Sequence, residues 1–226
     1  MSSKKNKKKS VPRKVAFVLG GINLLLLAIL GIIFLSDKMV GSNNNNIDNS
    51  NNTTKTNDNN VVVLDTSMGE IEIELFLEKS PITAGNFKKL VEEGFYDKTK
   101  FHRVIKNFMI QGGDPLTKDD SMQARWGTGG PGYVIKDEFI PGLSNLKGTI
   151  AMANSGPNSG GSQFFINMAD NTFLDWDKQP QTSKHPVFGK VVKGMDVVEK
   201  IINTKTTGAP YDRPLEPITI EKAYMK

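Results

Sequence analysis

The sequence predicts a mainly β domain, a closed antiparallel barrel capped by helices, preceded by a transmembrane helix and a disordered linker. Short runs rich in β-branched residues, separated by glycine-rich segments, recur through residues 61–226, and only two segments there have helical periodicity. Residues 15–35 carry no charge, and residues 41–60 are dominated by asparagine. We therefore divide the chain into a basic segment (1–14), a transmembrane helix (15–36), an asparagine-rich linker (37–60) and a folded domain (61–226).

The apolar run near the N-terminus predicts an uncleaved signal anchor. A helix over residues 15–35 would be about 31 Å long, close to the ~30 Å hydrocarbon thickness of a bilayer. A cleaved signal peptide and a buried soluble helix are the alternatives. A signal peptide has an apolar core of only about 7–15 residues and a small-residue cleavage site, and Ser36, Asp37 and Lys38 offer no such site.

Charge predicts the orientation of this anchor and the partners of the domain. Eight Lys or Arg occur among residues 1–40, which by the positive-inside rule keeps segment 1–14 cytoplasmic. We expect a single-pass cell-membrane protein with its folded domain outside the cytoplasm. Residues 61–226 have 20 basic and 21 acidic residues, so the net charge of +5 arises before the domain and gives no reason to expect nucleic-acid binding.

Two compositional features limit the remaining possibilities. Residues 41–60 contain ten asparagines and almost no apolar side chain, so they cannot bury enough surface to offset the entropy of ordering. The chain has no cysteine, which excludes structural disulfides, thiolate metal sites and a cysteine nucleophile. We expect a monomeric domain on a disordered tether.

Periodicity defines the elements of the domain. Residues 61–64 and 70–77 flank a turn at 65–69, and Ile71, Ile73 and Leu75 alternate with glutamates, as in a half-buried antiparallel hairpin. Ser80 and Pro81 predict an N-cap and first helical position, and Gly94 predicts the end of that helix. A second helix is predicted at 195–202 and a long ordered loop at 112–132. Further strands are predicted at 101–105, 108–111, 149–153, 163–167, 187–192 and 218–223.

The stretch FHRVIKNFMIQGGD, residues 101–114, predicts a peptide-binding surface. If 101–105 and 108–111 are adjacent strands, Arg103, Phe108, Met109 and Gln111 share one concave face. Taken singly, the apolar residues would belong to the core and the arginine to the solvated surface. Their joint spacing instead gives an apolar surface with one fixed charge, which suits an extended peptide.

Other chemistries lack the residues that they require. His102 and His185 are the only histidines, and no HExxH pattern or cysteine accompanies them, so we predict no metal site. Ser162 lies in GGSQF, which lacks the second glycine of a nucleophile elbow. The glycine-rich run 127–132 has no Lys-Ser/Thr pair, so it predicts a structural loop and no phosphate site.

Three blocks together resemble the cyclophilins, which are peptidyl-prolyl cis-trans isomerases. They are FHRVIKNFMIQGGD (101–114), GTIAMANSGPNSGGSQFFI (148–166) and HPVFGKVVKGMDVVEKI (185–201), and the resemblance covers about 160 of the 226 residues. It implies an eight-stranded β-barrel with two capping helices that binds proline-containing polypeptides in a groove and needs no cofactor or metal.

The resemblance also implies the site residues. It assigns catalysis to Arg103, Gln111, Phe108 and His185, and substrate binding to Met109, Ala153, Asn154, Gln163, Phe165, Phe173 and Leu174. Within this set Arg103 is the catalytic arginine, with a proline-ring pocket beside it. Phe173 stands where many eukaryotic members have tryptophan; this resembles bacterial members and implies weak cyclosporin binding. Residues 176–184 form a longer loop than the shortest members have.

The chemistry of prolyl isomerisation explains why an arginine beside an apolar pocket is suitable. Rotation about an X-Pro bond has a barrier of about 18–20 kcal/mol because the nitrogen lone pair is delocalised into the carbonyl. In the twisted state that nitrogen becomes a hydrogen-bond acceptor, and Arg103 can donate to it without any proton transfer. We expect an isomerase that assists folding of exported or surface proteins. The alternative is a chaperone or scaffold that grips proline segments without turnover.

Overall fold

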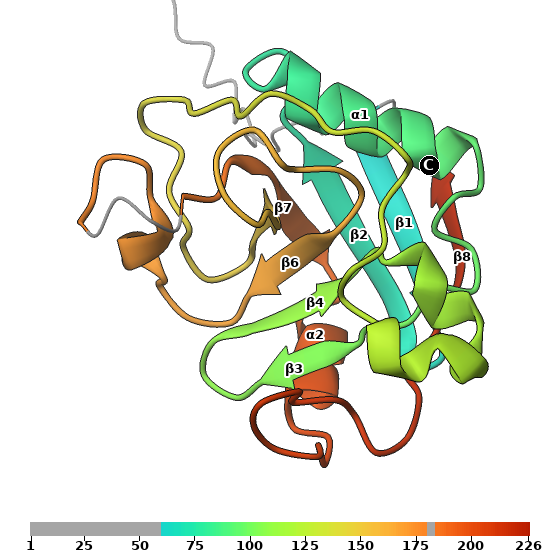
Figure 1. Ribbon diagram of the computed structural model, residues 1–226. Coiled ribbons are helices and arrows are strands. Elements are labelled where there is room, and N and C mark those ends of the chain that lie inside the picture. Colours follow the sequence, from blue (N-terminus) through green and yellow to red (C-terminus); the bar gives the residue numbers. More distant parts are fainter. Residues whose placement is uncertain (1–59, 180–183) are drawn as a thin grey trace, which may run out of the picture. The chain divides into compact units, whose positions relative to one another are not determined.

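Eight antiparallel strands form one continuous sheet in the order β3-β4-β6-β5-β7-β2-β1-β8 (Figure 1). The computed structural model describes residues 60–179 and 184–226. The strands are β1 Val61–Thr66, β2 Gly69–Leu75, β3 Arg103–Ile105, β4 Met109–Gly112, β5 Thr149–Met152, β6 Phe164–Asn167, β7 Val187–Lys193 and β8 Ile220–Met225. The helices are α1 Pro81–Glu92 and α2 Met195–Ile202, with short 3-10 helices at η2 Pro115–Lys118, η3 Asp120–Arg125 and η4 Thr172–Leu174. The predicted mainly β class, the eight strands and the two α-helices are confirmed.

The sheet curves into a half-barrel, so the closed barrel that we expected is only partly formed. Strands β3 and β8 are the two ends of the ladder and are not paired with each other. The segment before β3 bridges the seam, because Lys98 N donates to Ile220 O (2.7 Å) and Phe101 N donates to Ile218 O (2.9 Å). Strand β3 has only three residues and is too short to form a ladder with β8. A few backbone hydrogen bonds join the two ends of the sheet in its place.

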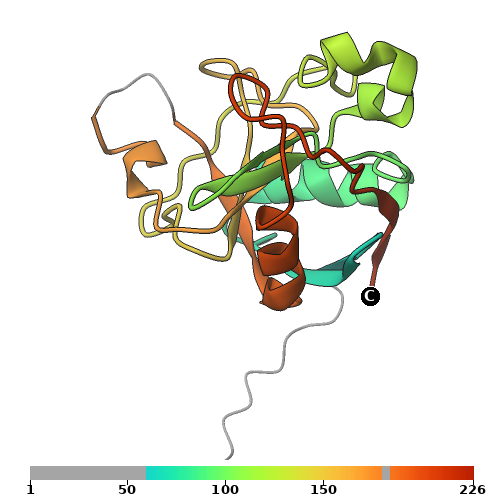
Figure 2. The same cartoon turned by 90° about the horizontal axis from the view of Figure 1, so that it is seen from below.

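The concave side of the sheet and the two helices enclose the main core. Helices α1 and α2 lie at opposite ends of the half-barrel (Figures 1 and 2). Helix α2 contributes Val197, Val198, Ile201 and Ile202, which are buried at helical spacing as the sequence predicts. The core includes the aromatic side chains of Phe87, Tyr96, Phe101, Phe164 and Phe188.

Helix α1 begins at Pro81 as predicted, but its N-terminal cap comes from a distant residue. The side chain of Ser80 makes no capping bond and donates to Glu138 Oε2 (2.8 Å). The Glu138 carboxylate accepts from the backbone N–H groups of Ile82 (3.0 Å) and Thr83 (3.0 Å). A carboxylate at this position satisfies unpaired N–H groups and complements the positive end of the helix dipole.

The glycine-rich segment 112–132, predicted as a long ordered loop, also contains short helical turns that its lack of periodicity did not predict. It contains the 3-10 helices η2 and η3, which lie beside the half-barrel in Figure 1. The buried Asp114 carboxylate holds the segment together by accepting from Leu116 N (2.8 Å), Gly127 N (2.5 Å) and Gly129 N (3.2 Å). Side-chain bonds of this kind leave no periodicity in the sequence.

The predictions for residues 1–14 and 15–36 lie outside the described residues, as does the linker 37–60 except for Asn60. Among residues 60–179 and 184–226, no helix has the length and apolar character needed to cross a bilayer. The basic segment, the anchor and the linker therefore stay predictions.

Candidate active site

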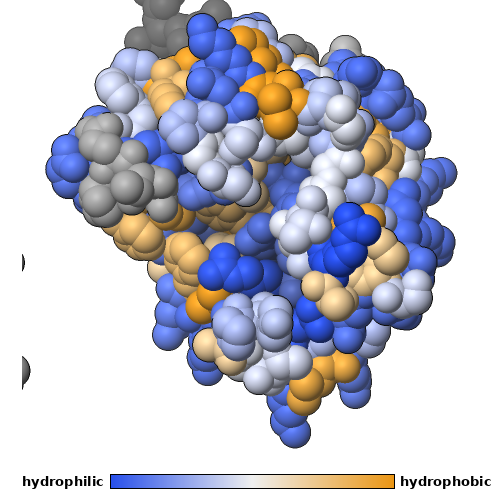
Figure 3. Space-filling view, viewed as in Figure 1, coloured by the Kyte–Doolittle hydropathy of each residue, from blue (hydrophilic) through white to orange (hydrophobic). Residues whose placement is uncertain are grey.

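Most of the predicted site residues line one pocket on the convex side of the half-barrel. This pocket has a volume of about 230 Å³. We call it the proline pocket, and it is lined by Arg103, Phe108, Met109, Gln111, Ala153, Asn154, Phe165, Leu174 and His185. These are nine of the eleven predicted residues; the other two, Gln163 and Phe173, lie next to it. The face shown in Figure 3 is hollowed near its centre.

The β3–β4 hairpin brings the arginine and its first amide partner together. Arg103 pairs with Gln111 in the ladder, and the chain turns through Asn107, whose φ is 60°. Asparagine tolerates this left-handed conformation better than most residues. Because directly opposite residues of antiparallel strands point to the same face, Arg103 and Gln111 both face the proline pocket.

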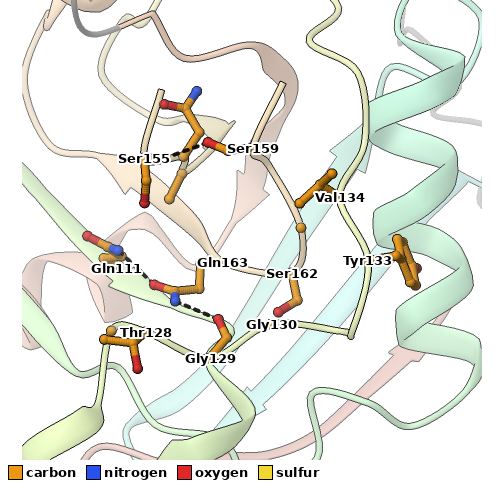
Figure 4. A pocket seen from close by; sticks show the side chains of 14 residues that line it. Gln111, Thr128, Gly129, Gly130, Tyr133, Val134, Ser155, Ser159, Ser162 and Gln163 are labelled. Atoms are coloured by element: carbon orange, nitrogen blue, oxygen red, sulfur yellow. Dashed lines mark hydrogen bonds between the residues drawn. The ribbon is translucent and has the colours of Figure 1, made fainter. Parts of the chain in front are cut away.

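A chain of three hydrogen bonds orients Arg103. Its Nη1 donates to Gln111 Oε1 (3.4 Å), and Gln111 Nε2 donates to Gln163 Oε1 (3.0 Å). Gln163 Nε2 then donates to the backbone oxygen of Gly129 (2.8 Å), as Figure 4 shows. We call this chain the amide relay. It links the guanidinium to the glycine-rich segment and leaves most of its N–H donors available to a ligand.

The floor of the proline pocket is a small apolar cluster, separate from the main core. It consists of Met109, Ala151, Phe165, Leu174 and Val187. Leu174 comes from η4, and the other four side chains come from β4, β5, β6 and β7, where their sequence neighbours face the main core. An apolar floor beside a guanidinium lowers the local dielectric and strengthens any hydrogen bond that Arg103 donates.

His185 forms one wall of this pocket as a neutral imidazole. Its ring meets Phe165 edge to face at 5.2 Å, and its Nδ1 lies 3.0 Å from Met152 O. Because a carbonyl can only accept, Nδ1 carries the proton. Burial lowers the pKa of His185 below its usual value, and the bond to Met152 partly offsets this. The ring is therefore an uncharged apolar wall at neutral pH.

Phe173 and Gln163 lie at the edges of the proline pocket and do not line it. The Phe173 ring stacks on Phe108 with 6.0 Å between centroids, and Phe173 is 52% exposed. Gln163 lines a neighbouring polar pocket of about 380 Å³, which we call the polar pocket. Its other lining residues include Tyr133, Val134, Ser155 and Ser159, labelled in Figure 4.

Sequence reasoning missed this polar pocket. Part of its wall is Gly127–Gly130, a run that we interpreted as purely structural. Gly129 accepts close packing that a larger residue could not, because a Cβ there would meet Asp114 Oδ1 at 2.1 Å. The spacing of glycines predicts close backbone approach in general, but not that the approach opens a pocket.

His102, the residue before Arg103, is buried beside Gly127 of the glycine-rich segment. It is 6% exposed, and within the described part of the chain neither ring nitrogen has a hydrogen-bond partner. Burial lowers its pKa from 6.5 to about 4. Across residues 60–179 and 184–226, no group of three or more His, Asp or Glu is placed to hold a metal ion.

A curved antiparallel sheet with an arginine beside an apolar pocket on its convex side defines a peptide-binding half-barrel protein. Comparison with known families shows which one. The sequence profile of the family described as "Cyclophilin type peptidyl-prolyl cis-trans isomerase/CLD" matches residues 61–225. The chain belongs to the cyclophilin-type peptidyl-prolyl cis-trans isomerases, and it is an enzyme of that class.

Individual relatives support the assignment. A peptidyl-prolyl cis-trans isomerase of Acinetobacter baylyi is 47% identical over 169 residues, covering 74% of this chain and 85% of that protein. Human peptidyl-prolyl cis-trans isomerase-like 1 is 42% identical, covering 72% of this chain and 90% of that protein. A crystal structure of a Cryptosporidium parvum cyclophilin-type isomerase has a TM-score of 0.63 at 30% identity, covering 74% of this chain and 97% of that chain.

Proposed function

We propose that this enzyme isomerises X-Pro bonds by holding the proline ring in the proline pocket and donating a hydrogen bond from Arg103 to the prolyl nitrogen. The observation that carries this proposal is the position of Arg103, a half-buried guanidinium at an apolar pocket lined by Phe108, Met109, Phe165 and Leu174. The Cryptosporidium parvum enzyme was also crystallised in the presence of the dipeptide Ala-Pro, and that structure has a TM-score of 0.62 to this chain.

Each part of the site has a role in this mechanism. The pocket holds the ring while the acyl side of the bond rotates, and no covalent bond is broken. The amide relay keeps Arg103 aimed at the place where the pyramidal nitrogen develops. A donor that fits the twisted state better than the planar state binds the two differentially, which lowers the barrier.

The backbone beside the pocket holds the residue before proline. Ala153 N already donates to Gln163 O (2.9 Å), so we propose that the pairing with substrate is made through Asn154. The Asn154 side chain is itself fixed, because its Nδ2 donates to Lys184 O (2.7 Å). A substrate chain anchored there presents its X-Pro bond to Arg103.

The experiment that tests this mechanism is substitution of Arg103 in the full chain. We expect Arg103→Ala to lower kcat/KM for an X-Pro peptide about 100-fold, as for loss of a donor that stabilises a transition state. Arg103→Lys keeps the charge without the planar fork and should recover only part of the rate. Arg125→Ala, at an exposed arginine on η3, is the matched control. An unchanged rate in Arg103→Ala would refute the mechanism.

The same variant separates this proposal from a chaperone or scaffold that only grips proline segments. If binding is the function, Arg103→Ala loses isomerisation while the cellular phenotype survives. If turnover is the function, both are lost together.

We further propose that the substrates are exported or surface proteins and that the enzyme is anchored in the cell membrane with its domain outside. This rests on the basic segment and the apolar run, residues 1–36. Protease added to intact cells should release a domain that begins between residues 41 and 60. Digestion only after lysis would refute this topology.

We also propose a bacterial-like ligand preference with weak cyclosporin binding. The phenyl ring of Phe173 has no N–H donor, whereas the tryptophan of many eukaryotic members has one. Calorimetric titration should give a dissociation constant well above nanomolar. Nanomolar binding would contradict this proposal.

A further inference from the structure

A third pocket shares the lining residue Asn154 with the proline pocket. It has a volume of about 260 Å³, similar to the proline pocket, and we call it the Trp176 pocket. It is lined by Asp137, Phe139, Asn154, Gly156, Pro157, Trp176 and Lys184. Apart from Asn154, and Lys184 whose backbone oxygen fixes it, none of these residues has a role in the mechanism above.

Asn154 lines all three pockets and is the point where they meet. Beyond it, residues 155–159 form a ridge: Ser155 and Ser159 line the polar pocket, whereas Gly156 and Pro157 line the Trp176 pocket. A peptide held at Asn154 therefore has one pocket on either side of this ridge. Because an extended chain advances about 3.3 Å per residue, its side chains reach either pocket within a few residues of the proline.

The walls of the Trp176 pocket are held in place without a ligand. Asp137 N donates to Asn158 Oδ1 (2.9 Å), and Asn158 N donates to Asp137 Oδ2 (2.7 Å). The opposite wall is tied by the bond from Asn154 to Lys184 O, and Lys184 is followed directly by His185 of the proline pocket. A preformed pocket binds a side chain without the entropic cost of ordering its own walls.

The chemistry of the lining selects an aromatic side chain. The apolar walls are Trp176, which is 41% exposed, together with the rings of Phe139 and Pro157. Two groups of opposite charge also line the pocket, the Asp137 carboxylate and Lys184, whose Nζ donates to Asp175 O (2.8 Å). Aromatic pairs add stabilisation beyond the area that they bury, whereas an acidic side chain would lose hydration among these rings.

We propose that the Trp176 pocket is a specificity subsite that takes an aromatic side chain of the substrate, within three residues of the isomerised proline. This inference rests on the proposed use of the proline pocket and Asn154, and we take the occupant to be part of the same polypeptide because Asn154 lines both pockets. The subsite lets the enzyme prefer proline segments that have an aromatic neighbour.

Peptide scanning with the full chain tests the subsite. An Ala-rich peptide with one proline is compared with peptides in which a single Phe, or a single Glu, occupies each of the three positions on either side. NMR exchange measures the isomerisation rate without a coupling protease, so peptides of any sequence can be compared. We expect Phe at one of these positions to lower KM about fivefold, and Glu at that position to raise it.

Variants connect the preference to the pocket. Trp176→Ala should abolish the fivefold preference while leaving the Ala-rich peptide unchanged, and Trp176→Phe should keep part of it. Tyr211→Ala, at an aromatic residue that is 63% exposed in the loop before β8, is the matched control and should keep all of it. The indole N–H resonance of Trp176 should shift on titration with the Phe peptide and not with the Ala-rich peptide.

The two possible failures are distinguishable. Absence of any Phe preference in the wild type, or its persistence in Trp176→Ala, would overturn the subsite even if the Ala-rich peptide is isomerised efficiently. If Arg103→Ala instead isomerises the Ala-rich peptide as fast as the wild type, the proposed mechanism fails, whatever the effect of Trp176.

Discussion

The two faces of the same strands build two regions of very different character. On one face Ile110, Phe164 and Ile166 join the large core that the helices cover. On the other face their sequence neighbours Met109 and Phe165 join the small cluster beneath the proline pocket. The large core closes completely over its side chains, whereas the small cluster leaves an open pocket bordered by Arg103.

This difference indicates that a single step along a strand separates stability from binding. Side chains in a strand alternate between faces, so neighbours such as Phe164 and Phe165 belong to different regions although they share one backbone. We expect substitutions on the core face to lower the free energy of unfolding and those on the pocket face to affect mainly the isomerase kinetics.

The strongest test of the comparison is the pair Phe164→Ala and Phe165→Ala. Phe164 packs against Phe87, Tyr96 and Phe101, so truncation leaves a cavity and should cost about 4 kcal/mol of unfolding free energy. Phe165 borders a pocket that is already open, so its truncation should cost about 2 kcal/mol and raise KM about tenfold. Urea titration and steady-state kinetics measure the two effects. Equal losses of stability would break the comparison.

The second largest effect is expected at His102, which faces inward while Arg103 faces the pocket. Its folded pKa is about 4, against 6.5 in the unfolded chain, because burial disfavours the charged ring. As pH falls below 6.5 the unfolded state binds the proton first, so stability is constant above about pH 7 and falls by about 3 kcal/mol down to about pH 4. His102→Phe should remove this part of the acid sensitivity in urea titrations at several pH values. A variant with the same pH dependence as the wild type would exclude His102 as its source.

The third largest effect is expected in the amide relay, where a substitution should change the kinetics and leave the stability of the core unchanged. Gln163→Ala removes the link between Gln111 and Gly129 and should lower kcat about tenfold, or about 1.4 kcal/mol, while the unfolding free energy changes little. Gln123→Ala, at an exposed glutamine of η3, is the control. A rise in KM without a fall in kcat would show that Gln163 holds substrate and does not position Arg103.

The smallest effect is expected at Glu138, which caps α1 over the core. Glu138→Gln keeps the shape of the side chain but loses the charge at the helix N-terminus, and should cost about 1 kcal/mol in urea titration. Because Glu138 supports the helix that covers the main core and does not line the proline pocket, kcat/KM should not change. Glu78→Gln, at an exposed glutamate before the helix, serves as the control.

Local patterns in the sequence were sufficient to predict most of the fold. Alternation in Gly69–Leu75, the apolar face of α2 and the turn at Asn107 each follow from residues close together in the chain. The resemblance of three blocks supplied the candidate site residues, and in the structure Arg103 lies opposite Gln111 in the β3–β4 hairpin.

The features that could not be predicted depend on contacts between distant segments. The Glu138 carboxylate caps a helix 56 residues earlier in the chain, and the Asp114 carboxylate organises a segment that has no periodicity. Strands β3 and β8 are not paired with each other because β3 has only three residues, a length that apolar periodicity did not define. The Trp176 pocket requires residues from three separate loops.

The bond between the two ends of the domain has a consequence for engineering. Lys226 N donates to Val61 O (2.9 Å), and Lys226 Nζ pairs with Glu72 (2.9 Å), so the first and last residues of the half-barrel are neighbours. A linker of a few residues would join them, and new ends could be opened at the exposed hairpin tip of Lys106 and Asn107. The domain is thus a suitable scaffold for circular permutation, in which the hairpin that carries Arg103 would become the free terminus.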